Sequence, residues 1–92
     1  LVERSELALH ELQFDLRARF PRLQAEYVLG DCGDEALMRR LIEHWRPDEL
    51  FHAAAYKHVP LLEAQPREAV RNNLFATEVV ARTAVALSLI HI

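Results

Sequence analysis

The sequence predicts an α/β fold in which parallel strands alternate with helices. Short apolar runs alternate with longer segments whose apolar residues recur at helical spacing, and the connections between them are short. This order is typical of parallel strands joined by right-handed crossovers, with helices covering the sheet. The chain of 92 residues is 51% hydrophobic, which fits one small domain or part of a larger one.

The first half of the chain begins at the end of a strand. Leu1–Val2 is interpreted as the close of a buried strand that runs into a polar turn. A helix is predicted from Glu6 to Phe20, because apolar residues recur along one face, Ser5 can act as N-cap and a proline follows. The run AEYVL, residues 25–29, predicts a second strand.

The second half repeats the alternation. Asp34 can cap a helix that ends at Arg46, and ELFHAAA, residues 49–55, predicts a third strand. A single turn is expected at residues 60–64, and Pro66 suits the first position of a longer helix. One face of that helix is expected to combine Ala69, Val70, Asn73, Thr77, Val80, Ala81 and Ala84.

These elements predict a partial doubly wound, Rossmann-like parallel sheet. Because the chain begins within a strand and its last helix has no ending signal, the sheet is expected to lack its first strand and its C-terminal half. In this fold the missing strand lies between the strand that ends at Val2 and the strand at 49–52. Unpaired backbone groups would remain there, so the isolated chain is expected neither to fold stably nor to bind NADP.

Charge and composition exclude several classes of function. The net charge of −3, with basic residues interleaved among acidic ones, gives no basic stripe for nucleic acid and no polybasic patch for a membrane. Cys32 is the only cysteine, so no intrachain disulfide forms, and the five histidines lack zinc-site spacing. The single cysteine favours a reducing compartment, so a cytoplasmic domain is expected. No apolar run reaches the roughly 20 residues of a membrane-spanning helix.

Three loops follow strand ends, where doubly wound sheets bind their ligands. In the first, ERSE, Glu3 is placed to accept hydrogen bonds from an adenosine ribose, as in NAD-binding proteins. Arg4 and Ser5 suit a ribose phosphate instead, so the loop leaves NAD and NADP open. An ordinary charged helix start has the same composition.

The second loop, GDCGD, holds two aspartates with separable roles. Asp31, at a strand end, can receive an adenine amino group, whereas Asp34 is expected to cap the next helix. The segment supplies too few oxygens at suitable intervals for a divalent cation, so no metal site is expected.

The third loop, AAAYKHVP, combines small and polar side chains. Ala53–Ala55 lack bulk and let a flat ligand pass close to the backbone, and Lys57 and His58 can hydrogen-bond to sugar hydroxyls or phosphate. A solvated lysine and a histidine bonded to backbone are the competing interpretation. Asn73, on the inward face of the next helix, can fix this loop, and a surface asparagine is the alternative.

The segment HAAAYKHVPLLEAQPREAVRNNLFAT, residues 52–77, closely resembles enzymes of bacterial capsule and O-antigen synthesis. These are the nucleotide-sugar 4,6-dehydratases and epimerases of the extended short-chain dehydrogenase/reductase type. The likeness extends through ERSELALHELQFDL and GDCGDEALMRRLIEHWRPDELFHAAA. It implies that residues 1–86 are a fragment of an NAD(P)-binding Rossmann domain. The tail LSLIHI, residues 87–92, departs from the family, resembles a translated sequencing adaptor and is expected to be non-native.

The resemblance also implies site residues. Lys57 matches a lysine that touches both cofactor and sugar nucleotide, and His58 is expected beside the sugar. Asn73 matches the asparagine of the family's NVxGT helix start, in which Ala76 replaces the glycine. The residues expected to bind NAD or NADP are Glu3, Arg4, Ser5, Glu6, Asp31, Cys32, Ala53, Ala54 and Lys57.

The implied activity is oxidation of a UDP-linked amino sugar at C4, loss of water across C5 and C6, and return of the hydride. The glycine-rich phosphate loop and the catalytic YxxxK segment of the family are absent, so no catalytic residue is expected in this chain. The parent protein is expected to be a homo-oligomer. It is also expected to be anchored at the bacterial inner membrane, because Tyr56 stands where related soluble dehydratases often have leucine and so resembles the residue of the larger members, which carry an N-terminal membrane region. The resemblance does not distinguish a dehydratase from an epimerase. The alternative is a noncatalytic α/β interaction domain, which the lack of an upstream G-x-G-x-x-G motif would favour.

Overall fold

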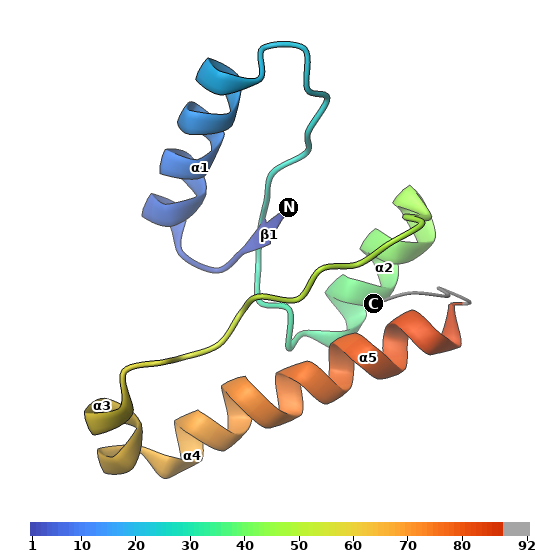
Figure 1. The fold of residues 1–92 in the computed structure, drawn as a ribbon. Coiled ribbons are helices and arrows are strands. Elements are labelled where there is room, and N and C mark those ends of the chain that lie inside the picture. The colour runs from blue at the N-terminus through green and yellow to red at the C-terminus, as the bar shows by residue number, and fades with distance from the viewer. Residues whose placement is uncertain (88–92) are drawn as a thin grey trace. The chain divides into compact units, whose positions relative to one another are not determined.

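The computed structural model describes residues 1–87. The chain divides into two compact units, one spanning Leu1–Asp31 and the other beginning at Cys32. The first unit contains β1 (Val2–Glu3), α1 (Glu6–Arg19) and β2 (Val28–Leu29). Figure 1 labels β1 and α1.

The first unit is a β-α-β element with a parallel strand pair. Val2 lies opposite Val28 and Glu3 opposite Leu29. The N–H of Val28 donates to the carbonyl of Leu1 at 2.9 Å, and the N–H of Gly30 donates to the carbonyl of Glu3 at 3.0 Å. The predicted parallel pairing is therefore confirmed, although β2 is shorter than the expected strand at 25–29.

The helix of the first unit begins where the sequence predicts. The Oγ of Ser5 accepts a hydrogen bond from the N–H of Ala8 at 3.3 Å, which satisfies one of the free donors of the first turn. The helix ends at Arg19, with Phe20 as C-cap and Pro21 following. None of its residues is buried, so α1 contributes little to a core.

The second unit is helical in its described part. It contains α2 (Glu35–Trp45), α3 (Val59–Ala64), α4 (Pro66–Ala69), a π-helical turn η1 (Val70–Phe75) and α5 (Ala76–Ala86). In Figure 1, α4 and α5 belong to one continuous helical run that includes η1.

The core of the second unit lies between α2 and α5. The N-cap Asp34 accepts a hydrogen bond from the N–H of Leu37 at 3.1 Å, which starts α2 as predicted. Outside the core, Arg82 of α5 pairs with Glu35 of α2 at 3.0 Å. The buried apolar side chains among residues 1–87 come from these two helices and are Met38, Ile42, Ala76, Val80 and Ala84.

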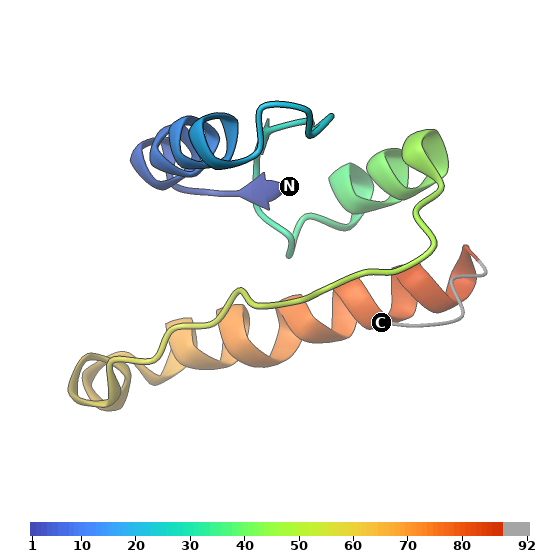
Figure 2. The same cartoon turned by 45° about the horizontal axis from the view of Figure 1, so that its top comes forward.

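The predicted third strand is wrong for the described chain. Residues 50–58 have no regular secondary structure, and the side chain of Phe51 is 88% exposed. A strand is stable only when its backbone groups pair with a neighbour, and residues 1–87 form one sheet of two strands, β1 and β2. The segment instead runs beside α5 and η1 in both Figure 1 and Figure 2, held by side-chain hydrogen bonds.

The predicted inward face of the last helix is only partly correct. Val80 and Ala84 are buried, whereas Val70 and Thr77 are exposed. Helical spacing fits two neighbouring stripes equally well, and packing against α2 selects one of them. The stripe that the structure buries comprises Asn72, Ala76, Val80, Thr83 and Ala84.

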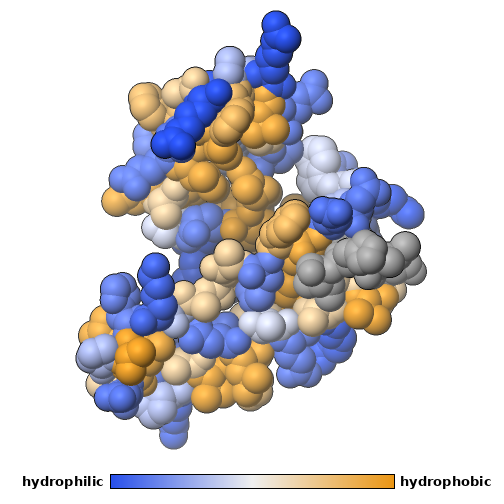
Figure 3. All heavy atoms as spheres, viewed as in Figure 1, coloured by the Kyte–Doolittle hydropathy of each residue, from blue (hydrophilic) through white to orange (hydrophobic). Residues whose placement is uncertain are grey.

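Large apolar side chains are exposed in both units, and Figure 3 shows them as orange areas between hydrophilic ones. Phe14 in the first unit is 73% exposed, and Phe75 in the second is 54% exposed. None of the helices in residues 1–87 combines the length and apolar character that a membrane span needs. The predicted non-native tail falls almost wholly outside the described residues and stays a prediction.

Candidate functional site

The first part of the site lies at the carboxyl edge of the β1–β2 pair. Because the two strands are parallel, the loops that follow them emerge at the same edge. Arg4 follows β1 and Asp31 follows β2, and the Nη1 of Arg4 lies 3.8 Å from the Oδ2 of Asp31. Both side chains are partly exposed, at 43% and 33%. The loops that follow β1 and β2 therefore lie next to each other at this edge.

The loop after β1 has a fixed internal geometry. The Oε1 of Glu3 accepts a hydrogen bond from the N–H of Ser5 at 2.8 Å. The Oγ of Ser5 in turn caps α1, and Glu6 lies exposed in the first turn of that helix. A carboxylate, a guanidinium and a hydroxyl thus lie within one short turn. This set can accept from ribose hydroxyls or donate to a ribose phosphate, which keeps both NAD and NADP compatible.

The two aspartates of the second loop have different contacts, and the predicted capping role of Asp34 is confirmed, whereas the adenine contact expected of Asp31 stays a prediction. Asp34 caps α2, whereas Asp31 is paired with Arg4. Cys32, between them, is half-buried and is not part of a disulfide. Residues 1–87 contain no group of three or more His, Cys, Asp or Glu side chains that could hold a metal ion.

The second part of the site is the segment between α2 and α3. The N–H of Tyr56 donates to the Oδ1 of Asn73 at 2.8 Å, and the Nδ2 of Asn73 donates to the carbonyl of Tyr56 at 2.9 Å. Both groups are partly buried. The prediction that Asn73 fixes the loop from an inward position is confirmed.

The same segment is held one helical turn further along. The Nε2 of His52 lies 2.9 Å from the Oγ1 of Thr77. Because the Thr77 hydroxyl donates its single proton to the carbonyl of Asn73 at 2.8 Å, it accepts from His52, which places the proton of the imidazole on Nε2. Ala53–Ala55 lie between the two attachment points and are exposed.

Lys57 and His58 follow directly after the attachment at Tyr56. Lys57 is the only lysine of the chain, and both side chains are exposed. The carbonyl of His58 accepts from the N–H groups of Leu61 and Leu62, each at 3.1 Å, as the first turn of α3 forms. The exposed cation of Lys57 therefore lies between Tyr56 and His58, whose backbone groups are both hydrogen-bonded.

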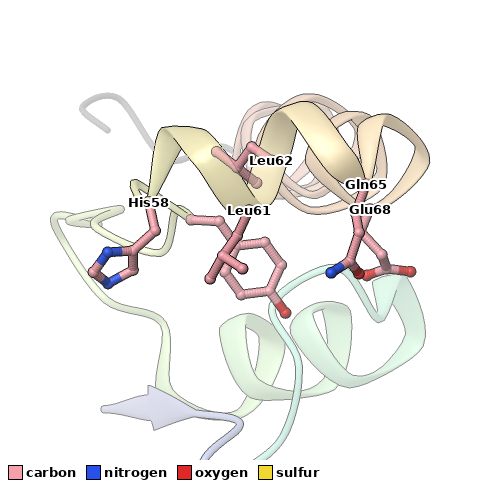
Figure 4. Close-up of a pocket in the computed structure, with 6 residues that line it drawn as sticks. His58, Leu61, Leu62, Gln65 and Glu68 are labelled. Carbon is pink, nitrogen blue, oxygen red and sulfur yellow. The ribbon is translucent and has the colours of Figure 1, made fainter.

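Tyr56 and His58, the two sequence neighbours of Lys57, line a pocket of about 230 Å³. Figure 4 shows the side chains of Leu61 and Leu62 between His58 on one side and Gln65 and Glu68 on the other. Apolar and hydrogen-bonding groups are thus combined in one hollow of the second unit, as in many sites for small organic ligands. The complete lining is Tyr56, His58, Leu61, Leu62, Gln65 and Glu68.

The predicted residues fall into two groups. The first unit brings together Glu3, Arg4, Ser5 and Asp31, and the second unit carries Ala53, Ala54, Lys57 and His58 on one segment. Sequence reasoning missed the pairing of His52 with Thr77 and the contribution of Asn72. The adjacent asparagines at 72 and 73 were the available signal, because an amide on the buried face of a helix needs a hydrogen-bond partner.

Known proteins resemble this chain over nearly its whole length. A family model described as "Polysaccharide biosynthesis protein" matches residues 1–92. The "Probable polysaccharide biosynthesis protein EpsC" of Bacillus subtilis (strain 168) is 36% identical over 85 residues, which is 91% of this chain and 14% of EpsC. A "UDP-N-acetylglucosamine 4,6-dehydratase (inverting)" of Campylobacter jejuni is 34% identical over 67 residues, 72% of this chain and 19% of the enzyme.

A solved structure shows the same fold. The X-ray structure of Pen from Bacillus thuringiensis matches with a TM-score of 0.80 and 34% sequence identity, covering 94% of this chain and 25% of Pen. The chain therefore spans a quarter or less of the length of these relatives. Its parallel strand pair and helices are compatible with a partial Rossmann-like fold. The family match over all 92 residues shows that the chain belongs to the polysaccharide biosynthesis protein family.

Proposed function

We propose that the chain is part of the cofactor-binding domain of an NAD(P)-dependent nucleotide-sugar 4,6-dehydratase or epimerase. The substrate would be a UDP-linked N-acetylhexosamine used in polysaccharide synthesis. The observation that carries the proposal is the 34% identity to an inverting UDP-N-acetylglucosamine 4,6-dehydratase, because the matched region includes most of the chain. The whole domain would have the doubly wound order, with this chain supplying two of its strands.

The first part of the site would hold the adenosine half of the cofactor. Glu3 and Asp31 offer carboxylate acceptors for the ribose and the adenine amino group, and Arg4 offers guanidinium donors for a ribose phosphate. Cys32 and Glu6 would also contact the adenosine half of the cofactor. The charge of Arg4, partly exposed beside Asp31, supports NADP as well as NAD.

The second part would hold the nicotinamide and the sugar. Exposed Ala53 and Ala54 would allow the cofactor to approach the backbone, and Lys57 would donate to the ribose and to the nucleotide sugar. His58 would contact the sugar. The cofactor would supply the hydride chemistry, while Lys57 and His58 would bind and orient the two ligands. The groups that move protons would lie in a part of the whole protein outside this chain.

The wider setting of the whole protein is also a proposal. The whole protein would be a homo-oligomer anchored at the bacterial inner membrane, as the likeness of Tyr56 to the residue at this position in the larger family members suggests. Fractionation of bacteria that express the whole protein would test the anchor, and gel filtration in detergent would test the oligomer.

The function is tested with the purified whole protein that contains this chain. It is incubated with UDP-N-acetylglucosamine and either NAD or NADP, and the sugar is followed by proton NMR. Appearance of a 4-keto-6-deoxy product is expected. No consumption of any UDP-N-acetylhexosamine, together with no binding of either cofactor, would overturn the proposal and favour the noncatalytic interaction domain.

A further inference from the structure

The adjacent residues Asn72 and Asn73 are hydrogen-bonded through their side chains. The Nδ2 of Asn72 donates to the Oδ1 of Asn73 at 2.9 Å. On a regular α-helix, adjacent side chains point in different directions and do not face each other. The pair lies within η1, where the N–H of Ala76 reaches back to the carbonyl of Arg71, five residues earlier. The widened turn and the unusual contact therefore coincide, as π-turns often do with functional positions.

Asn72 is buried, whereas its neighbours in the turn are not. Its exposed fraction is 6%, compared with 59% for Leu74. Asn72 and Thr83 are the buried polar residues of the described chain. Thr83 lies deeper in the α2–α5 core, whereas the amide of Asn72 is directed at the residue that holds the loop. A buried amide with this orientation indicates a role beyond filling space.

The contact favours one orientation of the Asn73 carboxamide. A carboxamide can rotate by half a turn, which exchanges its oxygen and nitrogen. Only one orientation lets Oδ1 accept from the N–H of Tyr56 while Nδ2 donates to the carbonyl of Tyr56. The Nδ2 of Asn72 can donate but not accept, so it stabilises that same orientation.

We propose that Asn72 is a positioning residue that, through Asn73 and the backbone of Tyr56, sets the position of Lys57 and His58. The π-turn brings the two asparagines into contact, and the hydrogen bonds carry their orientation to the loop. The hydrogen-bond relay stands on the geometry alone. Its consequence for ligand binding rests on the proposed function, because that function assigns Lys57 and His58 to the cofactor and the sugar.

The test uses Asn72→Asp in the whole protein, because this change replaces only the donor by an oxygen of the same shape. When ionised, the new carboxylate would face the Oδ1 of Asn73 without a proton between them. When protonated, its O–H can donate to the same oxygen, and burial raises the pKa of a carboxyl group. Amide hydrogen exchange of Tyr56, corrected for intrinsic rates, is measured by NMR across the accessible pH range.

The expected result is protection of the Tyr56 amide close to the unmodified protein at low pH. Protection should fall about tenfold as the pH rises through the pKa of the introduced carboxyl, which corresponds to the loss of one hydrogen bond. Asn72→Ala should lose protection at every pH. The control Leu74→Ala, at an exposed position in the same turn, should change nothing. The KM for the nucleotide sugar should rise together with the loss of protection.

Unchanged protection of Tyr56 in both Asn72 variants would overturn the relay. Equal loss of protection at Tyr56 and throughout α2 would also overturn it, because Asn72 would then be an ordinary core residue. If Tyr56 responds with the expected pH dependence while ligand binding stays constant, the relay is supported. In that case the assignment of Lys57 and His58 to the ligands, and not the relay, has failed.

Discussion

The carboxamide of Asn73 forms two hydrogen bonds with the backbone of Tyr56, one to the N–H at 2.8 Å and one to the carbonyl at 2.9 Å. Such a pairing replaces the ladder that a neighbouring strand would supply at this position. The helical run therefore fixes a segment that has no strand partner within residues 1–87. Asn73, which lies further along the sequence, thus holds the backbone of the residue that precedes Lys57.

Loss of the Asn73 side chain should destabilise the protein. Asn73→Ala removes both hydrogen bonds to the partly buried backbone of Tyr56, so the free energy of unfolding should fall by about 1–3 kcal/mol. Asn73→Asp keeps the acceptor for the N–H of Tyr56 and should cost less. Urea denaturation of the whole protein measures the difference, with Leu74→Ala as the exposed control. Equal midpoints for Asn73→Ala and the unmodified protein would contradict the prediction.

Removal of the Lys57 amine should weaken both ligands without affecting the fold. The side chain is exposed, and hydrogen bonds from a charged donor contribute about 1.5–3 kcal/mol, so Lys57→Ala should raise the Michaelis constants for cofactor and sugar nucleotide by about tenfold or more. The melting temperature should stay the same. Arg40→Ala, which removes an exposed cation from α2, is the matched control. Unchanged constants for both ligands would remove the role assigned to Lys57.

Arg4 should distinguish the two nicotinamide cofactors. If its guanidinium binds a ribose phosphate, Arg4→Ala should weaken NADP by about tenfold and leave NAD nearly unchanged, because only NADP carries that group. Isothermal titration calorimetry of the whole protein with each cofactor measures the two affinities. Asp31→Asn, which removes the charge that pairs with Arg4, is the companion variant. An equal effect of Arg4→Ala on both cofactors would assign the residue to a different role.

Local signals predicted more of this fold than long-range ones. Ser5 and Asp34 cap their helices as their positions predicted, because a cap depends on residues within one turn. The parallel pair β1–β2 and the link from Asn73 to the loop were also predicted. The strand at 49–55 was not correct, because a strand forms only when a partner is present, and propensity does not contain that information.

The site was predictable only in part for the same reason. The alternation of strands and helices located the loops at 3–6 and 30–34, and the parallel pair brings them to one edge. The π-turn η1 was missed, because the residue inserted in such a turn leaves no clear spacing signal in a segment as short as Val70–Phe75. The contacts of Lys57 with its ligands and the doubly wound order of the whole domain stay predictions.

Thr83 offers a test of the α2–α5 core. Its side chain is 1% exposed, and its Oγ1 has no hydrogen-bond partner among the described residues. Thr83→Val replaces the hydroxyl by a methyl group of similar shape, so the protein should become more stable by about 1 kcal/mol. Thr77→Val is the control with the opposite sign, because the Thr77 hydroxyl bonds to His52 and Asn73. Denaturant unfolding of both variants measures the effect, and a loss of stability in Thr83→Val would contradict it.

The isolated chain of 92 residues should show no cooperative thermal transition that NADP raises. The buried apolar side chains of residues 1–87 all belong to α2 and α5, and α1 buries none of its residues. Burial on this scale gives little free energy to offset the ordering of a whole chain, because each fixed residue costs about 1–2 kcal/mol in backbone entropy.

Circular dichroism melts with and without NADP test this expectation, and the whole protein under the same conditions is the positive control. A ligand that binds only the folded state raises its melting temperature in proportion to the logarithm of its concentration. The whole protein should show this rise and the isolated chain should not. A cooperative transition of the isolated chain that moves upward with NADP would contradict the expectation, because it would show that these 92 residues fold and bind NADP without the rest of the protein.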